Sequence, residues 1–294
     1  MFKKLLTRKL NGFNGLNHAL LSILFMLVFM IIPLEPFQLT FAQLKNNILL
    51  FIICLVVLAG GALFPDLDND SSSAGYTLGP LGSIMTVFMK STSSVVWNIY
   101  HFNGDQRPTT QHRYLWHAPL IWVGLLALFY FGLPSGNFTI FTNLSNSIQT
   151  GNFGYFVQTN ATLVLFIILT FMAVLVGSNM VIYSITTIFD LPYLIKYILP
   201  SLVLIYIFTT NYTNLRIIGI SFATGALLHC IEDAFCDTGL PSLIFPIPQF
   251  WRNKVWGRIK LLPITFQTQS KFTQKVVSVL SGVLIVAMLI VVFK

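Results

Sequence analysis

Charged residues are scarce in this sequence. They make up 9% of its 294 residues, whereas an ordinary soluble domain carries about 25%. Hydrophobic residues, by contrast, reach 55%. This imbalance excludes a typical soluble globular domain and places the chain among integral membrane proteins.

Cysteine is scarce as well. The three cysteines, Cys54, Cys230 and Cys236, do not have the spacing of a disulfide framework. Cys54 lies within an apolar run, so we expect it to be an ordinary buried residue. Cys230 and Cys236 flank a polar segment, and a cytoplasmic position of that segment would argue against a disulfide between them.

Long apolar runs are what the sequence has in abundance. A membrane-spanning helix needs about 20 apolar residues with few charges. The first run follows several basic residues, but it is too long for a signal core and lacks a small-residue cleavage site, so we expect a retained span. We predict an all-α, polytopic membrane helix bundle of about seven spans, forming a single integral membrane domain over residues 1–294. The seven runs are 15–33, 47–64, 114–133, 161–185, 191–210, 215–235 and 276–293.

Basic residues are distributed unevenly between the loops. If the N-terminus starts inside and each run crosses once, all but three of the 17 lysines and arginines fall on the inner side; the exceptions are Lys45, Arg216 and Lys294. Because basic loops stay on the cytoplasmic side, this count predicts a cytoplasmic N-terminus.

The same arrangement places seven ionisable residues at one face. Residues 78–100 are apolar but contain Lys90 and many serines and threonines. If they crossed the membrane as an eighth span, His112 and His117 would lie on the other side of the membrane from Asp66. We therefore predict that residues 78–100 are re-entrant or lie along the membrane interface. The seven residues stand at the predicted cytoplasmic ends of the first, second, third and sixth runs: His18; Asp66 and Asp68; His112 and His117; His229 and Asp233.

Spacing along the chain suggests which of these side chains converge. His229 and Asp233 are four residues apart and would share one face of a helix. His112 and His117 are five apart, so they converge only if His112 precedes the helix or begins it. Asp66 and Asp68 follow Pro65, and extended geometry would send both carboxylates the same way.

Histidine and aspartate together are typical metal ligands. Ionisable groups within spans cost about 2.5–3.5 kcal/mol each, so seven that converge indicate function. Neutral imidazoles and carboxylates suit zinc best here, with manganese or iron as alternatives. Because the set exceeds the needs of one tetrahedral ion, it predicts either two ions or one ion with a residue left over as general base.

Plainer interpretations exist for single residues. His18 alone could be a satisfied polar group in a helix bundle, and Asp66, Asp68 and Asp70 could form a solvated turn. His112 with Arg113 could be a simple anchor at the membrane interface. We expect His101 to be a surface residue. Three further acidic residues are interpreted mostly as helix caps or solvated ends: Asp190, Glu232 and Asp237. Glu232 and Asp237 are nevertheless kept as reserve candidates, because they are close to the predicted site.

One loop interleaves aromatic and basic residues. Segment 251–260 begins with Trp251, ends with Lys260 and reads Trp-Arg-Asn-Lys-Val-Trp-Gly-Arg-Ile-Lys. Such a segment suits the lipid bilayer surface, in particular anionic lipid headgroups, better than nucleic acid. The alternative is a simple positive-inside bias.

The order of the polar motifs resembles the YdjM-like family of inner-membrane metal-dependent hydrolases, also described as LexA-binding. The resemblance covers residues 17–122 and 219–248 and leaves the spans at 161–210 and 276–293 as additions to a common core. The matching elements are His18; residues 61–68 (Gly-Ala-Leu-Phe-Pro-Asp-Leu-Asp) with Ser71; residues 112–117 (His-Arg-Tyr-Leu-Trp-His); and residues 229–233 (His-Cys-Ile-Glu-Asp) with Gly239 and Pro246.

Several positions depart from the family pattern. Asn69 stands where a histidine is common, and Tyr114, Trp116 and Ala118 replace small or hydroxyl residues around the second histidine. These departures affect what the resemblance implies about the identity of the substrate more than what it implies about metal binding. The resemblance implies a multi-pass protein of the bacterial inner (cytoplasmic) membrane.

The residues and the resemblance together predict a membrane-bound metal-dependent hydrolase with its site at the cytoplasmic face. Asp68 would be a ligand or the base that activates water, and Arg113 would stabilise an anionic phosphate or carboxylate. A phospholipid or other membrane phosphoester is the preferred substrate. The expected metal ligands are His18, Asp66, Asp68, His112, His117, His229 and Asp233.

Two other classes of function fit the same residues. A metal or proton transport protein would carry ionisable residues at mid-membrane depth, whereas here they stand at the ends of the runs. A non-catalytic membrane scaffold that binds a cytosolic protein partner would hold a structural metal with closed coordination.

Overall fold

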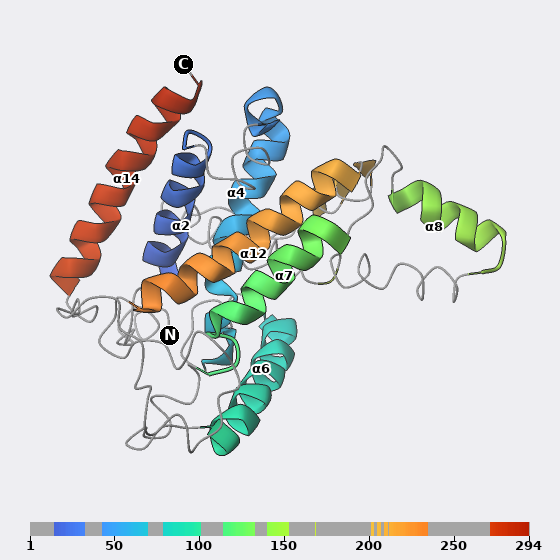
Figure 1. The fold of residues 1–294 in the computed structure, drawn as a ribbon, viewed down its shortest axis with the longest axis horizontal. Helices are drawn as coiled ribbons and strands as arrows, with labels where there is room; N and C mark the ends of the chain where they lie inside the picture. The colour runs from blue at the N-terminus through green and yellow to red at the C-terminus, as the bar shows by residue number, and fades with distance from the viewer. Residues whose placement is uncertain are drawn as a thin grey trace.

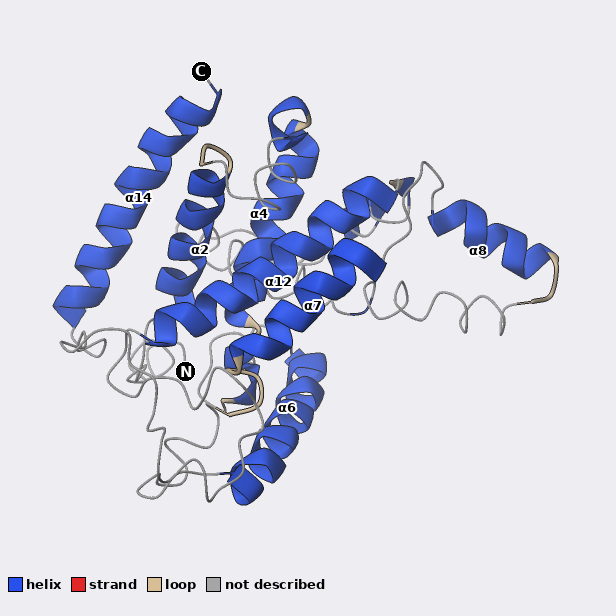
Figure 2. Cartoon of the chain, in the orientation of Figure 1, coloured by secondary structure: helices blue, strands red, loops and turns tan. Residues whose placement is uncertain are grey.

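The computed structural model describes part of the chain, and all its regular elements there are helices (Figure 2). The described residues are 15–32, 43–69, 79–100, 114–132, 140–152, 168, 201–202, 205–206, 209–210, 212–234 and 271–293. The helices are α2 (Gly15–Phe29), η1 (Gln43–Asn46), α4 (Ile48–Leu63), η2 (Pro65–Asp68), α6 (Gly79–Tyr100), α7 (Pro119–Gly132), α8 (Ile140–Gln149), α12 (Tyr212–Ala234) and α14 (Lys271–Phe293). The all-α fold class is therefore confirmed for these residues.

Five of the seven apolar runs coincide with helices α2, α4, α7, α12 and α14. Three helical stretches are long and apolar enough to cross a membrane, namely Ile48–Asp68, Thr213–Ala234 and Gln274–Phe293, while α2 and α7 are apolar but shorter. The runs at 161–185 and 191–210 lie largely outside the described residues. Membrane-spanning character is thus supported, and the total of seven spans and the orientation stay predictions.

Helix α12 is the centre of the bundle and packs on α4, α7 and α2 (Figure 1). It crosses α4 closely because two glycines face the partner backbone. A Cβ atom on Gly61 would come within 2.3 Å of the Phe222 carbonyl oxygen, and one on Gly225 within 2.2 Å of the Leu58 carbonyl oxygen. Small residues at a crossing let membrane helices approach backbone to backbone. This contact fixes the position of α12 relative to α4, and therefore the position of the side chains on α12.

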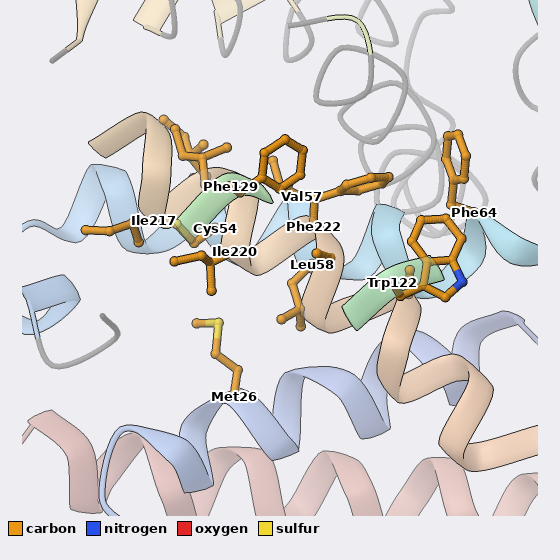
Figure 3. Packing of buried hydrophobic residues seen from close by; sticks show 14 of the residues in the cluster. Met26, Cys54, Val57, Leu58, Phe64, Trp122, Phe129, Ile217, Ile220 and Phe222 are labelled. Atoms are coloured by element: carbon orange, nitrogen blue, oxygen red, sulfur yellow. The ribbon is translucent and has the colours of Figure 1, made fainter. Parts of the chain in front are cut away.

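Aromatic rings fill the space beside this crossing (Figure 3). Phe222 lies edge-on to Phe64 and Trp122, with ring centroids 5.3 and 6.0 Å away. Edge-to-face geometry is the preferred arrangement of aromatic pairs. Trp122 also donates its indole N–H to the Trp116 carbonyl at 2.7 Å, so the ring cluster fixes the turn that precedes α7.

The third apolar run was expected to be helical from residue 114, but α7 begins at Pro119. Residues 114–118 form bends and turns instead. Proline is favoured at the first helical position, and it disfavours helical geometry at the residue before it, here Ala118. His117 therefore lies in a turn in front of the helix.

Two helices pack on the rim of the bundle. Helix α14 lies beside α2 (Figure 1), where Asn17 accepts a hydrogen bond from the Ser278 hydroxyl and donates to the Gln274 carbonyl at 3.3 Å. Helix α6 packs against η2. Its Ser93 donates to Asp68 at 2.6 Å, and Trp116 donates to Thr92 at 2.9 Å.

Candidate metal centre

Four side chains from three parts of the chain, namely η2, the turn before α7 and helix α12, meet at the end of the α4–α12 crossing. The Nε2 atoms of His117 and His229 lie 3.2 Å apart. Asp66 Oδ1 lies 3.5 Å from the first nitrogen and 3.7 Å from the second. Asp233 Oδ2 lies 3.4 and 3.6 Å from the same two nitrogens. Two triangles of nitrogen and oxygen atoms thus share the His117–His229 edge.

These separations match those between atoms that ligate one small cation. Bonds of about 2.0–2.1 Å to zinc in tetrahedral geometry place neighbouring ligand atoms about 3.3 Å apart. Three of the four residues are fully buried, while the Asp66 side chain is 24% exposed. The residues therefore fit a divalent metal by donor type and by spacing, and Asp66 marks the side open to solvent.

The position of His229 follows from the helix crossing. Its Nδ1 donates to the Ala62 carbonyl at 2.6 Å. That carbonyl belongs to the last turn of α4, where backbone acceptors lack a donor within the helix. Because Nδ1 carries the proton in this bond, Nε2 holds the lone pair and faces the centre. His229 and Asp233 lie on one face of α12, as their spacing predicted.

Asp66 and Asp68 do not point the same way, contrary to the expectation from extended geometry. Residues 65–68 form the 3-10 helix η2, which begins with Pro65. With about three residues per turn, side chains two apart diverge. Asp66 faces His117 and His229, whereas the buried Asp68 accepts a hydrogen bond from Ser93 on α6.

His18 joins the centre from α2. Its ring lies 4.0 Å from that of His229, centroid to centroid. Its Nδ1 donates to Glu232 Oε2 at 2.5 Å. Glu232 was interpreted as a cap or solvated end, and this is wrong, since its side chain is 5% exposed. The signal was present in the sequence, because Glu232 follows His229 by three residues and so shares its helix face.

Two sets of three residues have ligand atoms within 4.8 Å of one another. They are His18, His229 and Asp233, and Asp66, His117 and His229. His229 belongs to both sets but has only Nε2 to offer, because Nδ1 is bonded to Ala62. The two sets therefore describe overlapping halves of one centre.

His117 lies in the turn before α7. Burial, the largest influence, lowers the pKa of its imidazole, although Asp66 and Asp233 act in the opposite direction. A lowered pKa keeps the ring neutral at physiological pH, and the neutral imidazole is the form that ligates metals.

The structure brings five of the seven expected ligands together: His18, Asp66, His117, His229 and Asp233. Asp68 is bonded to α6 instead. His112 and Arg113 lie outside the described residues, as do His101, Asp70, Asp190, Asp237 and segment 251–260.

Comparison of the chain with protein-family models, with curated proteins and with solved structures finds no match.

Proposed function

We propose that this protein is a membrane-embedded metal-dependent hydrolase that holds one divalent ion, with zinc as the best fit. The observation that carries the proposal is a group of four atoms: the Nε2 atoms of His117 and His229 lie 3.2 Å apart, and one oxygen each of Asp66 and Asp233 lies 3.4–3.7 Å from both nitrogens. Ionisable side chains buried in a membrane bundle are costly, and a shared cation offsets that cost.

A divalent ion in this group would supply Lewis acidity to a water or a substrate oxygen. The chain's own residues determine how that chemistry is used. His117, His229 and Asp233 are buried and would hold the ion, while the partly exposed Asp66 would border the position that a substrate reaches. His18 completes the set from α2.

Asp68 takes a different role in this proposal from the ligand or base suggested by the sequence. Its Oδ2 accepts the hydrogen bond of Ser93, and the residue is 1% exposed. Because Asp66 and Asp68 belong to the same turn of η2, the bond to α6 fixes the orientation of Asp66. Asp68 is therefore a positioning residue.

A phospholipid or other membrane phosphoester is the substrate class we favour. The candidate centre lies at helix ends, beside η2 and the adjoining α6, rather than in the middle of the apolar helices. Arg113 and segment 251–260 would contribute positive charge for an anionic phosphate, as their composition suggests.

A non-catalytic scaffold with a structural metal is the second candidate, and the number of protein donors favours it. Structural metal sites are closed, whereas catalytic sites keep a position for water or substrate. The exposure of Asp66 is the observation against a closed site. Activity, rather than metal content, separates the two candidates.

The first test measures the metal content of the detergent-purified protein by inductively coupled plasma mass spectrometry. We expect bound metal in the unaltered protein and its loss in a His229→Ala, Asp233→Ala double variant. Cys54→Ala is the matched control, because Cys54 is a buried residue of a metal-binding type on α4 and is not part of the centre.

Hydrolysis of a chromogenic phosphodiester and of phospholipid vesicles is then measured with and without a chelator. Activity that disappears with the chelator and returns with zinc supports the hydrolase. Bound metal without hydrolysis of either would favour the scaffold, and unchanged metal content in the double variant would refute the site.

A further inference from the structure

Glu232 and His18 form a buried pair at the edge of the candidate centre. The Nδ1–H of His18 is donated to Glu232 Oε2 over 2.5 Å, and the two side chains are 2% and 5% exposed. The residues come from different helices, α2 and α12, and are 214 positions apart in the chain. The pair therefore joins two helices at the place where the metal ligands converge.

The hydrogen bond decides which nitrogen His18 can offer. Because Nδ1 carries the donated proton, only Nε2 retains a lone pair for a metal. Histidines that ligate metals almost always donate their other N–H to a carboxylate or a backbone carbonyl, which fixes both the tautomer and the ring orientation. His229 meets this requirement with the Ala62 carbonyl, and His18 meets it with Glu232.

The surroundings of Glu232 argue against an ordinary ion pair that merely stabilises the bundle. A buried ion pair contributes little net stability, because the loss of hydration offsets the attraction between the charges. Glu232 also adjoins Asp233, so two carboxylates stand side by side within the apolar helix α12. Such a concentration of acidic groups suits a site that contains a cation.

We propose that Glu232 is a positioning residue that holds His18 as the fifth protein ligand of the metal. This inference rests on the proposed metal centre and adds a ligand from α2 together with the carboxylate that orients it. It also explains why α2 belongs to the site, since His18 is the only residue of α2 in either of the candidate ligand sets among the described residues.

The test uses Co²⁺ as a spectroscopic probe in the full-length protein purified without metal. Glu232→Ala is expected to weaken Co²⁺ binding about 10–100-fold, the usual effect of losing a carboxylate behind a metal-ligating histidine. Glu232→Gln is expected to weaken it less, because the amide oxygen still accepts the bond from Nδ1. Both variants should alter the visible absorption of bound Co²⁺, which reports ligand number and geometry.

A double-variant cycle shows whether Glu232 acts through His18. In a His18→Ala background, Glu232→Ala should cause no further loss of affinity. Asn17→Ala is the matched control, because Asn17 is a buried neighbour of His18 on α2 that bonds α14 instead. It should leave Co²⁺ affinity and spectrum unchanged.

The outcomes separate this inference from the proposed function. Wild-type affinity and spectrum in Glu232→Ala and His18→Ala, with metal still bound, would overturn the role of the pair and leave the metal centre intact. Equal losses of Co²⁺ affinity from Glu232→Ala in the presence and absence of His18 would also overturn it. Failure of the unaltered protein to bind Co²⁺ or Zn²⁺ would overturn both proposals.

Discussion

The Nε2 atoms of His117 and His229 face each other at 3.2 Å although 112 residues separate them in the chain. His229 presents a lone pair there, because its Nδ1 proton is donated to the Ala62 carbonyl. Two carboxylate oxygens, from Asp66 and Asp233, lie within 3.7 Å of the same nitrogens. A divalent cation bound between these four atoms, as proposed above, would stabilise a cluster this close.

The first prediction is a stoichiometry of one metal ion per chain. Both candidate ligand sets contain His229, and its single available nitrogen cannot serve two ions. Titration of metal-free protein with Zn²⁺, followed by removal of loosely bound ion and elemental analysis, should give one equivalent. His229→Ala should abolish binding of this equivalent completely. Two equivalents bound by the unaltered protein, or one equivalent still bound by His229→Ala, would contradict a single centre.

The glycines at the helix crossing provide a second prediction. An alanine at Gly61 or Gly225 would place Cβ within 2.3 Å of a backbone oxygen, so α4 and α12 would have to separate. Separation would lengthen the bond between His229 and Ala62, so both metal affinity and resistance to thermal unfolding in detergent should fall.

Two other glycines serve as controls for this experiment. A Cβ on Gly124 of α7 or on Gly282 of α14 would meet no atom within 4 Å. Alanine at these helical positions should be neutral or stabilise the protein, by about 0.5–1 kcal/mol. Equal effects at all four positions would indicate that the crossing does not determine the site.

The sequence predicted the parts of the site that depend on helical periodicity. His229 and Asp233 share a helix face because they are four residues apart, and the structure confirms their contact. Asp66 and Asp68 could not be separated in this way, because the choice between an extended segment and a 3-10 turn after Pro65 depends on how η2 packs against α6. The helical spacing from His229 kept Glu232 as a reserve candidate, but its contact with His18 could not be predicted, because His18 comes from a distant helix.

Ser93 and Asp68 lead to a third prediction. Removal of the hydroxyl in Ser93→Ala leaves a buried carboxylate without this donor, at a cost of about 1–3 kcal/mol. Amide hydrogen exchange in α6 should therefore become faster, while metal content is retained. Ser91→Ala is the control, because Ser91 is an exposed serine on the same helix.

Asp68→Asn tests the same role from the other side of the bond. The amide oxygen can still accept from Ser93, so exchange in α6 should change little. If Asp68 positions η2, metal content and hydrolysis should both survive this substitution in large part. A complete loss of either would restore Asp68 as a ligand or as the base.

The last prediction concerns the depth of α6 in the bilayer. One side of this helix packs on the site through Met89 and Ser93, which are both fully buried. The other side carries an apolar stripe at helical spacings of three, four and seven residues, and its members are 53–65% exposed. The stripe consists of Ile84, Val87, Phe88, Val95 and Ile99.

An apolar face opposite a packed face fits a helix that lies along the membrane interface and covers the centre from the side of the bilayer. The test replaces Ile84 or Ile99 with a single cysteine in a protein from which the three native cysteines have been removed. A fluorophore is attached to each cysteine, and its depth in the bilayer is measured with shallow and deep lipid quenchers. An interfacial α6 gives both labels the same shallow depth, and a label at the exposed Lys90 is quenched less. A membrane-spanning α6 would instead separate the two labels by about 22 Å along the helix axis, because fifteen residues rise about 1.5 Å each. Unequal depths would therefore contradict the interfacial placement of α6.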